Sequence, residues 1–159
     1  MKSAKTDAFW AAFRAATGHG GKRYDAIGFG DTPEMMSELA ALVAIGQKRA
    51  TAGLLRDFGT AETPVPAAGD HVLVVDGRGE PVCIYLSTEV RIGPFSSVDN
   101  QFAWDEGEGD RTRDWWLVGH REFFTRQAAA EGFEMHDGIE MIFERFKVIW
   151  PPELADSAA

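Results

Sequence analysis

The fold of this chain is best read from residues 82–92, VCIYLSTEVRI. Apolar or β-branched side chains occupy every second position, which is typical of a strand with one buried face: Val82, Ile84, Leu86, Thr88, Val90 and Ile92. The apolar run HVLVV at residues 71–75 precedes it, and the turn residues DGRG at 76–79 separate the two. This spacing predicts an antiparallel β-hairpin at the centre of the fold.

Helical patterns lie on both sides of the hairpin. Apolar spacing predicts a first helix over residues 7–16, capped by Thr6, and the Thr-Pro-Glu start at Thr32 predicts a second helix that ends at Gly46. Ser96 and Ser97 are expected to cap a short third helix through Ala103.

A fourth helix is predicted around Trp116 and His120, ending before Gly132. The β-prone stretch 139–150, stopped by two prolines, predicts a last strand. Strands and helices mix without regular alternation, so the sequence favours an α+β barrel or curled sheet over a doubly wound fold.

Glycines suggest the limits of the main domain. The stretch GHGGKR at residues 18–23 reads as a flexible connection, which predicts an N-terminal helical extension at 1–22. The main domain is then expected at 23–152. Residues 153–159 are expected to form a disordered tail after the two prolines.

Charge and cysteine content narrow the classes of function. The formal net charge of -9 and the pI of about 4.9 argue against broad binding to duplex DNA, which requires many cationic side chains. Cys83 is the only cysteine, so neither an intramolecular disulfide nor a cysteine-rich zinc site is expected. The sequence contains no run of eighteen apolar residues, so no membrane-spanning helix is predicted. We therefore expect a cytoplasmic protein without a membrane partner.

Three segments, in order, resemble the ASCH domain, a relative of the PUA and EVE RNA-binding barrels. They are GQKRAT at residues 46–51, Gly69-Asp70 before a strand, and AWDEG at 103–107. The resemblance runs from about Phe29 to Trp150 and points to a longer bacterial branch. It implies a PUA-like small β-barrel of five to six mostly antiparallel strands with flanking helices.

The resemblance also implies a function. It predicts that RNA or a modified nucleoside or nucleotide binds in a cleft built around Lys48, Thr51 and Glu106. The alternative is a hydrolase, either an amidohydrolase acting on acetylated cytidine or a single-strand ribonuclease. Thr51 would then be the nucleophile, Lys48 the base and Glu106 the acid. A non-catalytic protein interaction domain is the third possibility, and a homodimer is also possible.

The chemistry of these three residues sets conditions on the hydrolase. A desolvated lysine has a lowered pKa and can activate a hydroxyl, whereas Glu106 can donate a proton only if burial raises its pKa. Lys48 and Thr51 are three positions apart, so in a regular strand they point to opposite faces. Direct contact requires a bulge or an irregular segment between them.

Other side chains are expected near the ligand, without a cofactor or a metal ion. The candidate ligand-binding residues are Arg49, Arg56, Trp104, Arg111, Arg113 and Trp115. Tryptophan faces stack on bases and arginines pair with phosphates. By contrast, Trp116 and His120 are interpreted as core residues, and the acidic run from Asp105 to Asp110 as a solvated loop rather than a metal site.

Overall fold

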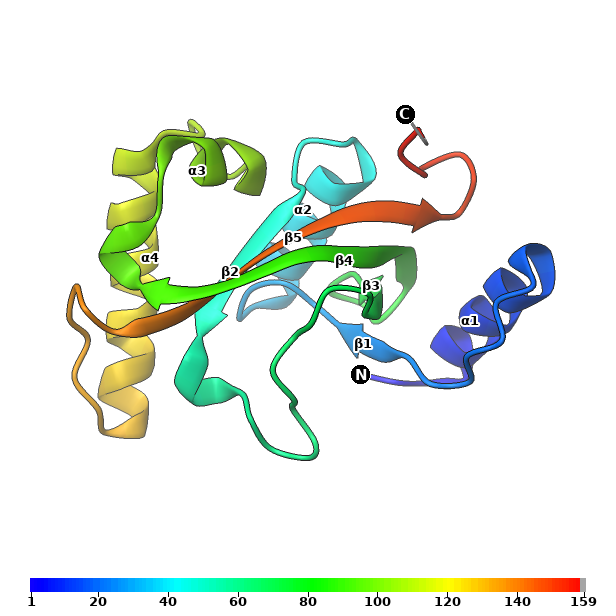
Figure 1. Cartoon of the computed structure of the whole chain (residues 1–159), viewed down its shortest axis with the longest axis horizontal. Helices are drawn as coiled ribbons and strands as arrows, with labels where there is room; N and C mark the ends of the chain where they lie inside the picture. The colour runs from blue at the N-terminus through cyan, green and yellow to red at the C-terminus, as the bar shows by residue number, and fades with distance from the viewer. Residues whose placement is uncertain (158–159) are drawn as a thin grey trace. The chain divides into compact units, whose positions relative to one another are not determined.

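The computed structural model of the chain describes residues 1–157. In this range the elements follow one another as α1 (Ala4–Thr17), β1 (Asp25–Ile27), α2 (Pro33–Ala44), β2 (Ala50–Leu54), β3 (His71–Val75), β4 (Pro81–Pro94), α3 (Asn100–Glu106), α4 (Arg113–Glu131) and β5 (Glu140–Trp150) (Figure 1). Short 3-10 turns, η1 (Leu55–Asp57) and η2 (Phe95–Ser97), follow β2 and β4.

The strands of residues 1–157 form one five-stranded sheet with the order β1-β3-β4-β5-β2. β3 and β4 pair antiparallel, with His71 opposite Leu86 and Leu73 opposite Ile84, so the predicted hairpin is confirmed. β2 pairs antiparallel with β5, whereas β1 runs parallel to β3. The sheet is therefore mixed, and the predicted α+β class with five strands and flanking helices is confirmed.

The chain divides into two compact units. The first unit contains residues 1–47, 67–89 and 146–157, and the second contains residues 48–66 and 90–145. β4 and β5 therefore contribute residues to both units. All the candidate site residues, from Lys48 to Trp115, belong to the second unit.

In the first unit, α1 packs its apolar face on the hairpin strands. Trp10 and Phe13 are buried together with Leu73 and Ile84. The helix begins with a capping box, because the Ser3 side chain accepts the backbone N–H of Thr6 and the Thr6 hydroxyl accepts that of Ser3. The prediction that Thr6 itself is the cap is wrong, because the helix starts three residues earlier. The predicted cap of α2 is confirmed, since Thr32 accepts the backbone N–H of Met35.

Part of the segment predicted as a tail is bonded to β5. The backbone N–H of Asp156 donates to Val148 O at 2.8 Å, and the Asp156 carboxylate accepts the N–H of Val148 at 2.9 Å. Leu154 packs against a second apolar cluster of the first unit, which includes Tyr85 and Phe146. The last two residues of the predicted tail, 158–159, lie outside the described residues.

Two neighbouring histidines are expected to make the first unit sensitive to acid. The rings of His19 and His71 lie 4.4 Å apart between centroids. Burial of His71 and the charge of His19 lower its pKa below 6.5, although a hydrogen bond to Gly69 and the charge of Asp70 oppose them. Unfolded His71 therefore takes up its proton at a higher pH than folded His71, and stability is lost as the pH falls from 6.5 toward the folded pKa.

We therefore expect the loss of unfolding free energy between pH 7.5 and pH 5.5 to be smaller in His71→Gln than in the wild type. Urea unfolding at each pH measures the two losses. Subtracting one loss from the other cancels the contribution of the carboxylates that both proteins share. His136→Gln changes an exposed histidine and serves as the control. Equal losses in the wild type and in His71→Gln would contradict the expectation.

In the second unit, α3 and α4 pack on β2 and β5 around one apolar cluster. Ala50 and Leu54 of β2 and Phe143 of β5 share this cluster with Phe102 and Trp116 of the two helices. These contacts fix the ends of α3 and α4, where the site is found.

The predicted start and end of α3 are wrong. Asp99 caps the helix by accepting the backbone N–H of Phe102 at 2.8 Å, whereas Ser96 and Ser97 lie in the turn η2. The Ser97 hydroxyl donates to Pro94 O instead, and α3 continues past Ala103 to Glu106. Asp99 accepts well at an N-cap because its carboxylate faces the unpaired N–H groups of the first turn.

Candidate functional site

The connection between α3 and α4 is a short loop with three left-handed backbone positions. They are Gly107 at φ 75°, Gly109 at φ 59° and Arg111 at φ 65°. Glycine adopts such angles freely, but Arg111 is the one non-glycine residue of the described chain with positive φ. The tight loop brings the last residue of α3 close to the first turns of α4.

Lys48 points its ammonium group into the second unit. Its side chain is 1% exposed, and Nζ donates to Ala50 O at 2.9 Å and to Glu108 Oε2 at 3.1 Å. Nζ also lies 3.5 Å from Glu106 Oε1. The backbone N–H of Arg49 donates to Asp105 O at 2.7 Å, which ties the entrance of β2 to the last turn of α3. Lys48 is therefore held beside the two glutamates.

Glu106 is more deeply buried than Glu108, and its side chain is 3% exposed. The indole N–H of Trp116 donates to Oε2, and His120 Nε2 lies 3.3 Å from Oε1. Burial raises the pKa of Glu106, but the charges of His120 and Lys48 and the hydrogen bonds from His120 and Trp116 outweigh it and lower the pKa to about 2. Glu106 is therefore a carboxylate at neutral pH.

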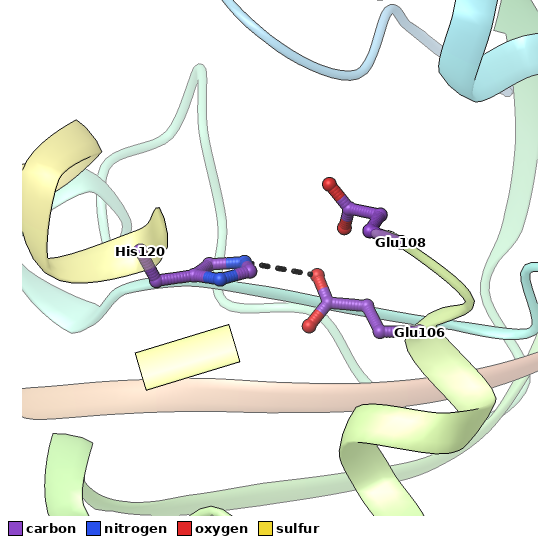
Figure 2. Close-up of side chains that lie close together, drawn as sticks. All are labelled: Glu106, Glu108 and His120. Atoms are coloured by element: carbon purple, nitrogen blue, oxygen red, sulfur yellow. Dashed lines mark hydrogen bonds and ion pairs between the residues drawn. The ribbon is translucent and has the colours of Figure 1, made fainter. Parts of the chain in front are cut away.

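His120 comes from α4 and faces Glu106, while Glu108 approaches from the loop after α3 (Figure 2). The imidazole stacks on Trp116 at 4.0 Å between centroids, and Nδ1 lies 2.9 Å from Trp116 O. Because a carbonyl oxygen only accepts, Nδ1 carries a proton. Burial lowers the pKa of His120. The charge and hydrogen bond of Glu106 and the charge of Glu108 raise this pKa by more than burial lowers it, so the net shift is upward.

Glu108 is the outermost carboxylate, with 17% of its side chain exposed. Burial and the charge of Glu106 raise its pKa above 4.5, although the charge of Lys48 opposes them. We call Lys48, Glu106, Glu108 and His120 the polar cluster. The interpretation of Glu106 and Glu108 as parts of a solvated loop is wrong, because the turn at Gly107 folds both side chains inward.

Thr51 is not brought to the polar cluster. Ala50, Ala52 and Leu54 of β2 all face the apolar cluster of the second unit, so Thr51, which lies between them, points to the other face of the strand. It pairs across the sheet with Glu144. Within residues 1–157 no hydrogen bond joins its hydroxyl to Lys48 or Glu106, so the structure brings together two of the three predicted residues.

Two members of the polar cluster were not predicted from the sequence. His120 follows Trp116 by four positions, and this helical spacing fits a core residue as well as a site residue. Glu108 follows Glu106 by two positions within an acidic run. The available signal was Gly107, since a glycine at a helix end reverses the chain and brings its neighbours together.

Exposed aromatic side chains flank the same loop, Trp104 on α3 and Trp115 on α4. Trp104 is 53% exposed, and the guanidinium of Arg111 lies 3.8 Å above its ring while Arg111 Nε donates to Trp104 O at 2.9 Å. Trp115 is 39% exposed, and its ring covers Gly109 so closely that a Cβ there would lie 2.1 Å from it. We call Trp104, Arg111 and Trp115 the tryptophan surface.

The other predicted ligand-binding arginines make contacts of their own. Arg49 donates to Lys48 O, and Arg113 donates to Val98 O at 2.6 Å and to Ser96 O at 2.9 Å. Arg56 lies 3.6 Å above the ring of Phe133 and 3.9 Å from Glu131, at the C-terminal end of α4. Because α4 spans nineteen residues, Arg56 lies at the far end of the helix from Arg113.

Residues 25–150 match the family model of the ASCH domain. The chain belongs to the ASCH domain family. The ASCH domain structure from Lactobacillus crispatus JV V101 is 27% identical, with a TM-score of 0.85 over 92% of this chain and 94% of that one. A protein from Enterococcus faecalis V583 is 29% identical, with a TM-score of 0.83 over 91% and 88% of the two chains. No curated protein matches the chain.

These likenesses confirm the resemblance predicted from the three sequence segments and the fold that it implies. The ASCH domain of this chain includes the whole of the second unit's polar cluster and tryptophan surface, because both lie between residues 25 and 150. In the described part of the chain, each helix is too short or too polar to cross a membrane.

Proposed function

We propose that this ASCH domain protein binds single-stranded RNA or a modified nucleoside on its tryptophan surface, beside the polar cluster. The observation that carries the proposal is the stack of Arg111 on the exposed ring of Trp104. Bases of single-stranded RNA stack on aromatic rings and on guanidinium planes, and the cation also attracts phosphate. A surface that offers both an aromatic ring and a guanidinium group suits this ligand class.

The backbone of the loop supports the same proposal. Holding Arg111 at a φ of 65° is unfavourable for a side chain with a Cβ, so other contacts must offset its cost. The Nε bond to Trp104 O and the ring contact do this. Such strained positions occur preferentially where a side chain serves a ligand. The net charge of -9 restricts phosphate contact to local groups such as Arg111.

The hydrolase in which Thr51 attacks and Glu106 donates a proton has less support. Thr51 points to the face of β2 opposite Lys48, and the pKa of Glu106 is lowered rather than raised. A general acid must hold its proton at the working pH. Product analysis after incubation with acetylated cytidine and with short RNA tests this alternative directly.

Trp104→Ala is expected to weaken binding of a fluorescein-labelled single-stranded octaribonucleotide about 5- to 150-fold, because each base–aromatic stack contributes about 1 to 3 kcal/mol. Fluorescence anisotropy at constant salt measures the dissociation constant, and calorimetry does the same for acetylated cytidine. Val118→Ala is the matched control, because Val118 is a 60% exposed apolar residue of α4. Equal affinity of Trp104→Ala and the wild type, or no binding by either, would overturn the proposal.

A further inference from the structure

Three side chains of the polar cluster converge with their ligand atoms. One oxygen each of Glu106 and Glu108 and one ring nitrogen of His120 all lie within 4.8 Å of one another. They come from the end of α3, from the following loop and from α4, so three separate segments meet at one point (Figure 2). The two outer members, His120 and Glu108, are 13% and 17% exposed, so they lie nearer to solvent than Glu106 at 3%.

The neighbours of these side chains orient them as ligands. The N–H at Nδ1 of His120 donates a hydrogen bond to Trp116 O, and this orientation of the ring directs Nε2 toward Glu106. The indole N–H of Trp116 holds the second oxygen of Glu106. Histidines and carboxylates that bind metal ions usually have such outer partners, which fix the tautomer and the ring orientation.

The distances are compatible with one shared ion. His120 Nε2 and Glu106 Oε1 are 3.3 Å apart. Two ligands at zinc-like distances in tetrahedral geometry lie about 3.4 Å apart. One oxygen of Glu108 lies within 4.8 Å of both atoms, so an adjustment of its side chain would complete the set.

We infer that Glu106, Glu108 and His120 form a site for one first-row divalent cation, with a coordination position left open to solvent. One imidazole and two carboxylates favour Zn²⁺ or Mn²⁺ over Ca²⁺, which prefers six to eight oxygen ligands. Three protein ligands are typical of sites that keep a position open for water or substrate. The inference does not depend on RNA binding.

Lys48 is the natural competitor for this site. Its ammonium lies 3.1 Å from Glu108 and 3.5 Å from Glu106 and supplies a positive charge to the two carboxylates. A bound cation must share these oxygens with Lys48 or displace it. Removing the ammonium therefore strengthens metal binding if the site is real, and this outcome separates a metal site from a set of ion pairs.

The test uses the full chain after treatment with EDTA and gel filtration, titrated with ZnCl₂ or MnCl₂ by isothermal calorimetry. We expect one ion per chain, bound at least tenfold more weakly in Glu108→Gln and in His120→Gln. Glu122→Gln and His136→Gln remove an exposed glutamate and an exposed histidine elsewhere and should bind like the wild type. No uptake by the wild type, or equal uptake by Glu108→Gln, overturns the inference.

Lys48→Met supplies a second readout that remains informative if the His120 variant does not fold. We expect Zn²⁺ to raise the melting temperature of Lys48→Met more than that of the wild type, because the ion replaces the missing charge between the glutamates. Circular dichroism checks that the variant is folded in the presence of the ion. A smaller or equal rise in Lys48→Met overturns the inference.

Discussion

Lys48→Met is expected to lower the free energy of unfolding by about 3 to 5 kcal/mol in buffer containing EDTA, because breaking one side of a buried ion pair leaves uncompensated charge behind. Glu106 and Glu108 would then keep His120 as their cationic partner but lose the ammonium at 3.5 and 3.1 Å. The carbonyl of Ala50 would also lose its donor at 2.9 Å. Methionine keeps the unbranched shape, so packing contributes little to the difference.

Urea unfolding measures the loss, and two comparisons give it meaning. Lys147→Met makes the same substitution at an exposed position of β5 and should cost less than about 1 kcal/mol. Adding Glu106→Gln to Lys48→Met should recover part of the lost stability, because one of the unpaired charges is removed. A single-variant cost below about 1 kcal/mol would contradict the buried position of the Lys48 ammonium.

The strands and helix ends were predicted where local chemistry determines them. The strict alternation from Val82 to Ile92 predicted β4, and Thr32 followed by proline predicted the start of α2, because each signal acts within a few residues. The start of α3 was misassigned among several good caps. Ser96, Ser97 and Asp99 all suit an N-cap, and only the packing of Phe95 and Phe102 in the second unit selects Asp99.

The polar cluster was only partly predictable, for a different reason. Lys48 and Glu106 came from the ASCH resemblance, and their ion pair spans 58 positions in sequence. His120 belongs to the same cluster because α4 packs against α3, which no local pattern reports. Thr51 follows Lys48 closely in sequence, yet Lys48 lies before β2, and the alternation within β2 points Thr51 away from the apolar cluster. Proximity in sequence was therefore misleading here, and tertiary packing made the site.

Trp116→Phe is expected to lower the free energy of unfolding by about 3 kcal/mol, because a buried carboxylate loses a donor and a small cavity forms. Phenylalanine keeps the apolar contact with Phe95 and the stack on His120 but lacks the indole N–H that Glu106 accepts. The loss therefore reports chiefly on the hydrogen bond to the charge. Thermal and urea unfolding in EDTA give the value.

Trp115→Phe makes the same change one residue earlier in α4, at a 39% exposed position, and should cost about 1 kcal/mol or less. The decisive comparison is Trp116→Phe in a Glu106→Gln background. If the indole N–H acts on the charge of Glu106, removing the indole in the Glu106→Gln background costs less stability than removing it in the wild type. The reason is that a hydrogen bond to a neutral amide is weaker than one to a carboxylate. The same cost in both backgrounds would assign the effect to packing alone and would remove Trp116 from the groups that orient Glu106.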